Sequence, residues 1–141
     1  MSGKLQQKLR DAGWLYDPAD GFITLVGGLW RRQHGEGLEF GFIAGQDHAN
    51  RNGMVHGGML MTFVDRAFGM SSRLASGAPR AATISLNHQF MAPMQIGEFA
   101  RVVPNVVKLT TRMAFVEGTV MRDDTALMGA QGVWRLARGE S

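Results

Sequence analysis

Residues 50–65 read NRNGMVHGGMLMTFVD, and this stretch decides how the rest of the chain is organised. Two adjacent glycines, Gly57 and Gly58, open an apolar run that ends on the carboxylate of Asp65. The pattern predicts a loop that turns into a helix at His56. Backbone N–H groups at a helix start have no partner inside the helix and carry partial positive charge. The stretch therefore offers an anion-binding helix start and, two turns later, a candidate base.

The helix predicted from this stretch covers residues 57–75 and is the longest in the chain. Its apolar residues almost surround the helix axis, which is typical of a helix buried on nearly all sides. Residues 76–79 read SGAP, and a glycine followed shortly by a proline ends a helix. The chain is therefore expected to fold around one central buried helix.

Strands are expected on both sides of the central helix. Alternation predicts that residues 83–90 form a strand with Thr83 and Ile84 on opposite faces. Pro104 marks a bulge or an unpaired edge in a later strand. The complete prediction is a short amphipathic helix at 3–13, strands at 22–30 and 38–43 with a polar turn at 31–37, the central helix, and strands at 83–90, 98–109, 112–121 and 126–136.

These elements predict an α+β fold in which an antiparallel sheet of about six strands wraps around one long helix, because short connections favour antiparallel pairing. Residues 1–141 are expected to form a single domain, with the N-terminal helix within residues 1–15 and a tail at 137–141. Strands left at the edge of such a sheet pair readily with another copy of the chain, so a homo-oligomer is expected.

The composition excludes several classes of function. Hydrophobic residues make up 45% of the chain and charged residues 19%, as in an ordered globular protein. The formal charge of +3 comes without any basic run longer than Arg31-Arg32, which argues against a nucleic-acid partner. The absence of cysteine excludes disulfides and thiol nucleophiles. A polar N-terminus and the lack of a long apolar segment favour a cytoplasmic protein without a membrane partner.

The element order and the motif NxxGxxHGG at residues 50–58, followed by Asp65, resemble the hotdog fold. Within that fold, the chain is similar to the PaaI-type acyl-CoA thioesterases over residues 20–136. The resemblance implies an enzyme that hydrolyses a thioester to a free carboxylic acid and coenzyme A. It also implies a homodimer that assembles into a homotetramer, with an active site that combines the acid of one subunit with the asparagine of the other.

Four residues form the predicted catalytic group. The N–H of Gly57 can bind the thioester oxygen because no Cβ keeps the substrate away, although the glycines can also serve only a tight turn. The resemblance makes Asp65 a general base or a nucleophile that forms an anhydride; the alternatives are a solvent-facing acid or one paired with Arg66 or Arg73. Asn50 holds a water or the carbonyl, or is an Asx-turn residue, and Asn52 is the local alternative for the same role. His56 transfers protons or fixes the loop by a hydrogen bond.

The predicted substrate-binding residues are Gly58, Met61 and Thr62, which share the helix face of Asp65, together with Thr83. The resemblance places a hydroxyl near the acid at position 83. No metal is expected, since the histidines outside the motif are not spaced as ligands, and no cofactor beyond the coenzyme A of the substrate. The phosphates of coenzyme A need cations, and the sequence offers, without ranking them, Arg31, Arg32, Arg80, Lys108 and Arg112.

Two other functions stay open. A hotdog dehydratase or hydratase uses a histidine paired with an acid, and His56 with Asp65 fits that description. A non-catalytic acyl-CoA-binding protein on the same fold has no need of the acid. The sequence does not choose between aromatic and fatty acyl groups.

Overall fold

The computed structural model describes residues 2–138. Its strands are β1 (Leu15–Asp17), β2 (Leu29–His34), β3 (Gly37–Ile43), β4 (Arg80–Phe90), β5 (Phe99–Val102), β6 (Asn105–Leu109), β7 (Met113–Arg122) and β8 (Thr125–Ala137). Its helices are α1 (Ser2–Asp11), α2 (Phe22–Val26), the short 3-10 helix η1 (Gln46–His48) and α3 (Gly57–Ser76). All eight described strands form one antiparallel sheet, in the order β1-β2-β3-β5-β7-β8-β4, with β6 paired to β7 beside this path.

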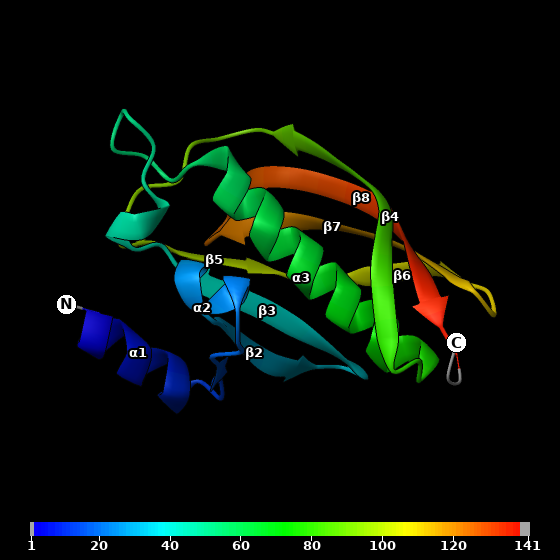
Figure 1. The fold of residues 1–141 in the computed structure, drawn as a ribbon. Coiled ribbons are helices and arrows are strands. Elements are labelled where there is room, and N and C mark those ends of the chain that lie inside the picture. Colours follow the sequence, from blue (N-terminus) through cyan, green and yellow to red (C-terminus); the bar gives the residue numbers. More distant parts are fainter. Residues whose placement is uncertain (1, 139–141) are drawn as a thin grey trace.

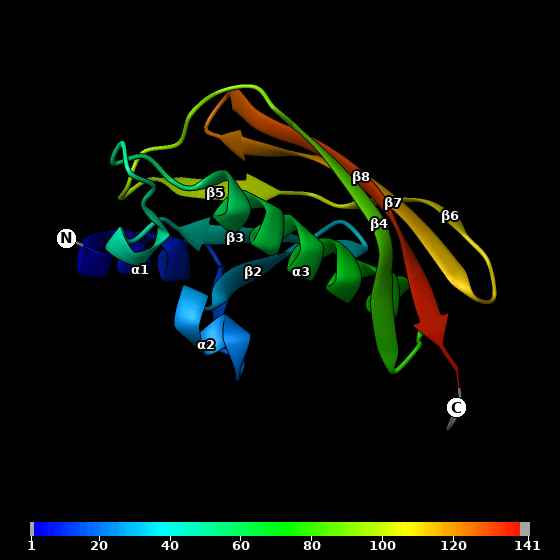
Figure 2. The ribbon, with the colours of Figure 1, turned by 45° about the horizontal axis from the view of Figure 1, so that its top comes forward.

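The sheet curves around α3, which lies in its concave face (Figure 1). Figure 2 shows the same relationship from a second angle, with α1 and α2 at the end of the sheet formed by β2 and β3. The predicted α+β fold, an antiparallel sheet wrapped around one long helix, is confirmed. The sheet has eight strands in the described residues rather than the six expected.

The ends of α3 agree closely with the prediction. The helix begins at Gly57 and ends at Ser76, followed by Gly77 in the left-handed conformation with φ of 75°. The N–H of Gly77 donates to the carbonyl oxygen of Arg73 at 2.8 Å, which satisfies one of the free carbonyls at the helix end. Neither α3 nor any other helix within residues 2–138 combines the length and apolar content needed to cross a membrane.

One side of α3 is covered by the sheet and the other side is bare around its middle. The buried side chains of the helix are Met59, Leu60, Phe63, Val64, Ala67, Phe68 and Ser72. By contrast, Met61 is 39% exposed, Leu74 is 61% exposed, and Asp65 is exposed. The expectation of a helix buried on nearly all sides is therefore wrong for the single chain, because the sheet covers only one face.

The strand predicted at 22–30 is wrong in its first half, where the chain forms α2. The cause lies in the glycine pair that follows. Gly27 has a φ of 89°, a left-handed conformation that breaks a strand, and a Cβ on Gly28 would lie 2.2 Å from the carbonyl oxygen of Asp17. β2 then extends to His34, through most of the expected polar turn. It pairs with β1, which is too short for sequence alternation to reveal.

The strands after α3 agree with the prediction except at two places. The strand expected at 98–109 is divided at Pro104 into β5 and β6. The tail expected at 137–141 is wrong for its first two residues, because Ala137 belongs to β8 and Arg138 donates to two backbone carbonyl oxygens at 3.0 and 2.8 Å. The rest of that tail lies outside the described residues. At the other end, the predicted N-terminal helix is present as α1.

A bulge in β4 changes which of its side chains face α3. Thr83 is paired with Trp134 of β8, and Ser85 is paired with the residue next to that tryptophan, so Ile84 has no partner. One extra residue in a strand reverses the alternation of faces beyond it. Thr83 and His88 therefore lie on the same face, toward α3, although the sequence alternation placed them on opposite faces.

Candidate functional site

The loop before α3 is shaped by Asn50. Its side-chain Oδ1 accepts the N–H of Asn52 at 2.8 Å and the N–H of Met54 at 3.1 Å, which makes an Asx turn. An antiparallel bridge between Ala49 and Val55 closes the base of the loop. The side-chain amide nitrogen of Asn50 has no hydrogen-bond partner within residues 2–138, so the turn leaves both of its N–H donors unused.

His56 caps the start of α3. Its Nδ1 accepts the N–H of Gly58 at 2.8 Å, and its backbone N–H donates to the carbonyl oxygen of His48 at 2.7 Å. A neutral histidine whose Nδ1 accepts carries its proton on Nε2. This hydrogen bond fixes the loop, as one of the two roles considered for His56 from the sequence requires. Because the N–H of Gly58 donates to His56, it is not available to bind a ligand.

The N–H of Gly57 is the donor left over at the start of α3, since it has no partner among the described residues. A Cβ added to Gly57 would lie 3.1 Å from the ring of Phe90, which is 54% exposed and lies beside the helix start. The missing side chain therefore lets the ring of Phe90 lie close against the start of the helix. A free N–H at the positive end of a 20-residue helix suits an oxygen that gains negative charge.

Asp65 is held by a strand residue. The hydroxyl of Thr83 donates to Oδ1 of Asp65 with 2.5 Å between the two oxygens, which joins β4 to α3. The carboxylate forms no ion pair with Arg66, whose guanidinium instead lies 3.3 Å from Oδ1 of Asp17. Asp65 thus keeps one oxygen without a protein partner on the bare side of the helix, within the described chain.

Gly57 and Asp65 of one chain are too far apart to act on the same carbonyl group. Eight residues separate them, and a helix rises about 1.5 Å per residue, so they lie roughly 12 Å apart along the axis. A thioester whose oxygen binds the N–H of Gly57 therefore lies beyond the reach of Asp65 in the same chain.

His88 is a residue of this region that the sequence reasoning missed. Its imidazole stacks on the ring of Phe90, with centroids 6.4 Å apart and planes 20° from parallel. Burial lowers the pKa of His88 below the usual value of 6.5, and the charge of Asp65 opposes that shift. The sequence considered His88 only as a metal ligand, because plain alternation placed it away from Thr83. No sequence signal marks the bulge that turns both side chains to the same face of β4.

The other predicted substrate-binding residues have distinct surroundings. Thr62 donates its hydroxyl to the carbonyl oxygen of Gly58 at 2.9 Å, one turn back along the helix. That hydroxyl is used within α3, as is common for threonine in a helix. Met61 lies exposed on the same side as Asp65 and offers a flexible apolar surface.

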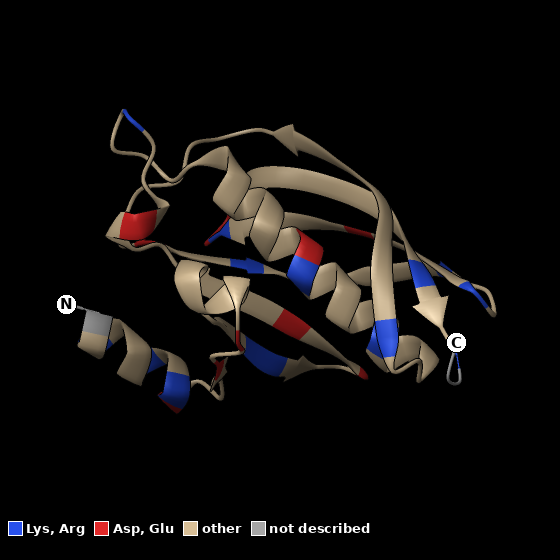
Figure 3. Ribbon diagram, in the orientation of Figure 1, with Lys and Arg blue, Asp and Glu red and all other residues tan. Residues whose placement is uncertain are grey.

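The candidate cations fall into different roles. Arg32 forms a 2.6 Å ion pair with Glu39, and its guanidinium lies over the ring of Trp14, so it holds the N-terminal part together. Arg80 and Arg112 instead line one hollow of about 550 Å³. Two arginines that the sequence did not single out, Arg135 and Arg138, line the same hollow, and its described lining contains no acid. Figure 3 shows basic residues gathered at this end of the sheet, near the start of β4 and the end of β8.

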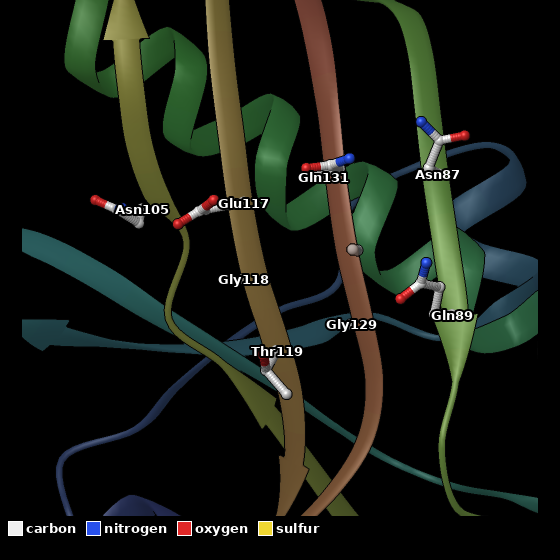
Figure 4. A pocket seen from close by; sticks show the side chains of 9 residues that line it. Asn87, Gln89, Asn105, Glu117, Gly118, Thr119, Gly129 and Gln131 are labelled. Atoms are coloured by element: carbon white, nitrogen blue, oxygen red, sulfur yellow. The ribbon is translucent and has the colours of Figure 1, made fainter.

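A second hollow, of about 410 Å³, lies on the outer face of the sheet, away from α3 (Figure 4). Asn87, Gln131, Glu117 and Asn105 form a row across β4, β8, β7 and β6, since each is paired with the next. The sheet separates this hollow from Asp65. Amide side chains beside one carboxylate provide hydrogen bonds but no nucleophile, so the catalytic candidate is the α3 side.

Sequence comparison places much of this region in a known family. Residues 52–128 match the thioesterase superfamily. Acyl-coenzyme A thioesterase 13 of Mus musculus is 26% identical over 87 residues, which is 62% of this chain and 62% of that protein. The chain thus spans less than two thirds of the length of the curated relatives it matches.

Solved structures share the fold. Thioesterase superfamily member 2 from zebra fish is similar with a TM-score of 0.76 and 22% identity, over 96% of this chain and 97% of that one. The E. coli PaaI protein is similar with a TM-score of 0.66 and 16% identity, over 72% of this chain and 73% of that one. These likenesses confirm the hotdog architecture and the resemblance to PaaI.

Proposed function

Because this chain belongs to the thioesterase superfamily, we propose that it hydrolyses an acyl-coenzyme A thioester to a free carboxylic acid and coenzyme A. The observation that carries the proposal is the pairing of Asp65 with Thr83 on a helix that begins with the unpaired N–H of Gly57. The name of the mouse relative supports coenzyme A as the group attached to the acid.

In the proposed reaction, the thioester oxygen binds the N–H of Gly57, and the side-chain amide of Asn50 adds a second donor. One such donor is worth about 3–4 kcal/mol when a carbonyl gains negative charge. Asp65 removes a proton from water while the water oxygen bonds to the carbonyl carbon, or attacks that carbon itself. When water attacks, the C–S bond then breaks, and coenzyme A leaves as a thiolate that takes up the proton. When Asp65 attacks, breaking of the C–S bond leaves an anhydride on Asp65, and water hydrolyses this anhydride to the free acid and the carboxylate while its proton goes to the thiolate.

The site is proposed to form between two chains. β4 is an edge strand of 11 residues whose outer side is unpaired within the described chain, and its side chains Ile84 and Phe90 are 57% and 54% exposed. Long unprotected edges of this kind pair with other strands. Antiparallel pairing of β4 with the β4 of a second copy gives a two-fold dimer, and such dimers can associate further into the expected tetramer.

The position of two contacts along β4 favours one register for this pairing. Thr83 is hydrogen-bonded to Asp65, and the ring of Phe90 lies close to Gly57. In a two-fold antiparallel pair, a register that sets Thr83 opposite the Phe90 of the other chain brings each Asp65 toward the other chain's Gly57. That arrangement removes the separation of roughly 12 Å along a single helix.

The hollow lined by Arg80, Arg112, Arg135 and Arg138 is the proposed site for the phosphates of coenzyme A. One guanidinium group can bind two phosphate oxygens at once, and several such groups around one hollow suit a highly charged anion. Arg138 donates to the carbonyl oxygen of Ser76, which lies 11 residues, or roughly 16 Å, along α3 from Asp65. Arg135 is paired with Ala82, next to the inward-facing Trp134, and so lies on the outer face of the sheet, so the pantetheine arm is proposed to pass around the free edge formed by β4 to reach Asp65.

A thiol-release assay with aryl, short-chain and medium-chain acyl-CoA tests the activity. We expect wild-type protein to release thiol from at least one substrate, and Asp65→Asn to abolish release without changing the thermal unfolding midpoint. Asp124→Asn, in the exposed turn between β7 and β8, is the matched control and should keep full activity. Absence of release by wild-type protein from every substrate would contradict the proposal, and hydration of an enoyl-CoA would favour the dehydratase instead.

Labelled water separates the two routes for Asp65. After one turnover in oxygen-18 water, label found in the Asp65 carboxylate identifies the anhydride route. Label found only in the released acid is expected for general-base catalysis.

The cytoplasmic location of the protein stays a prediction.

A further inference from the structure

A third hollow, of about 580 Å³, lies between α1, α2 and η1 at the end of the sheet formed by β2 and β3 (Figure 2). It is called the α1 hollow below. Trp30, which lines it, packs with Leu9 and Trp14, whereas the neighbouring Leu29 belongs to the core around α3. Because neighbouring side chains of a strand point to opposite faces, Trp30 faces away from α3. The α1 hollow is therefore separate from the catalytic site proposed at Asp65.

The wall of the α1 hollow is largely apolar. Most of its lining residues are apolar or glycine, among them Trp30, which is 3% exposed, Tyr16 and Ile43. The rings of Tyr16 and Trp30 lie against each other, with centroids 5.1 Å apart. Ligand pockets of proteins usually measure about 300–1,000 Å³ and combine apolar walls with a few polar groups that orient the ligand. The α1 hollow has both properties.

The charge in this hollow comes from Arg10, and its described lining contains no acid. The guanidinium of Arg10 lies 5.2 Å from the ring centroid of Trp30 and forms no ion pair among the described residues. His48 adds no charge, since its Nδ1 accepts the N–H of Gly45 at 3.0 Å and its Nε2 donates to the carbonyl oxygen of Val26. An imidazole bonded in this way is neutral. The hollow thus holds one positive charge without a counter-ion beside an apolar wall.

We propose that the α1 hollow binds a free carboxylic acid with an apolar body, its carboxylate on Arg10 and its body against Trp30, Tyr16 and Ile43. A guanidinium binds the two oxygens of a carboxylate side by side. One charge and a long apolar wall suit a monoanion rather than the several charges of the coenzyme A phosphates. The choice of a carboxylic acid rests on the proposed function, whose product is such an acid. The charge and the apolar wall of the site do not depend on that function.

Calorimetric titration of the wild-type protein with phenylacetate and octanoate measures the binding. At least one of the two should bind, and Arg10→Gln should raise its Kd about threefold to tenfold, since the charge pair lies partly in water. The uncharged amide of the same acid should bind more weakly by a similar factor and should be insensitive to Arg10→Gln. Lys8→Gln, at an exposed position of α1 outside the lining, is the matched control and should leave Kd unchanged.

Filling the hollow tests the site without changing a charge. Gly45 lines the hollow with a φ of −107°, which any residue adopts, and a Cβ added to it would meet nothing within 4 Å. Gly45→Leu should therefore abolish binding of the acid while the thermal unfolding midpoint stays unchanged. Wild-type protein that binds neither acid, or binding that survives both Gly45→Leu and Arg10→Gln, would overturn the proposal.

The indole N–H signals in an NMR titration locate the bound acid. The signal of Trp30 should shift, and that of Trp134, whose ring packs on Phe68 of α3, should not. A shift at Trp134 alone would place the acid on the α3 side and would overturn the inference. If the wild type hydrolyses no acyl-CoA but binds an acid at Arg10, the proposed function fails and the site stands. Hydrolysis without binding in the hollow would overturn the inference and leave the proposed function in place.

Discussion

The hydroxyl of Thr83 on β4 donates to the carboxylate of Asp65 on α3, with 2.5 Å between the two oxygens. This bond selects one orientation for a carboxylate that is otherwise exposed on the bare side of its helix. It also fixes β4 against α3 beside the edge where a second chain is expected. The bond therefore links the acid to the strand that is proposed to form the dimer.

Replacing this hydroxyl should slow hydrolysis without unfolding the protein. Thr83→Val keeps the branched shape but removes the donor. Because a hydrogen bond to a charged group is worth about 1.5–3 kcal/mol, kcat should fall roughly tenfold to a hundredfold. Thr83→Ser keeps the donor and should retain most of the activity. Steady-state kinetics of acyl-CoA hydrolysis measure both, and equal rates for the valine variant and the wild type would contradict a role for this bond.

Gly57→Ala tests the close approach of Phe90 to the helix start. The added Cβ would lie 3.1 Å from the ring of Phe90, so the ring must move or the substrate is kept away from the N–H group. We expect kcat/KM for acyl-CoA to fall. Phe90→Leu added to Gly57→Ala should restore part of the loss, since it removes the crowded ring. A double variant as impaired as the alanine variant alone would place the effect in the backbone rather than in the ring.

The sequence was sufficient for the central element. Paired glycines, an apolar run and a final glycine with proline predicted the bounds of α3 within one residue at its end, since each signal is local. Local signals failed at Gly28, where the close approach of the Asp17 backbone requires a glycine. A run of β-branched and aromatic residues there indicated a strand, but the chain forms α2.

The residues of the candidate site were predictable where local sequence determines their position. Asn50, His56 and Gly57 lie together because they are close in sequence, and the resemblance indicated the hydroxyl at position 83. His88 was not predictable in this way, because its placement depends on the unpaired Ile84 in the pairing of β4 with β8. Such a bulge is set by the contacts of both strands and leaves no mark in the alternation of one.

The stability of the protein should depend on pH through His88. Its pKa is lowered in the folded chain, so between that lowered value and 6.5 the unfolded chain binds more protons than the folded one. The free energy of unfolding should therefore fall as the pH drops below about 6.5. Above that pH, the contribution of His88 to stability should be complete and should no longer change with pH. His88→Leu removes this part of the dependence. Urea unfolding of both proteins at several pH values between 5 and 8 measures it, and parallel curves would contradict the assignment.

The hollow lined by Arg80, Arg112, Arg135 and Arg138, proposed as the phosphate site, predicts a preference for coenzyme A thioesters over thioesters of shorter thiols. Arg112→Ala or Arg135→Ala should raise KM for acyl-CoA roughly tenfold, because a charge-assisted hydrogen bond is worth about 1.5–3 kcal/mol. Neither should change kcat/KM for the same acyl group on N-acetylcysteamine, which carries no phosphate. Lys108→Ala, an exposed cation outside the hollow, is the control. Equal effects on both thioesters would show that the arginines act on the fold rather than on the phosphates.

The shared site makes a prediction that a single-chain site does not. In a dimer mixed from Asn50→Ala and Asp65→Asn chains, one site carries both defects and the other carries neither. Random mixing makes half of the dimers mixed, so about a quarter of all sites should be intact. Each variant alone should be nearly inactive, and the refolded mixture should recover about a quarter of the wild-type rate. A mixture no more active than its parts would mean that Asn50 and Asp65 act within one chain or do not act together.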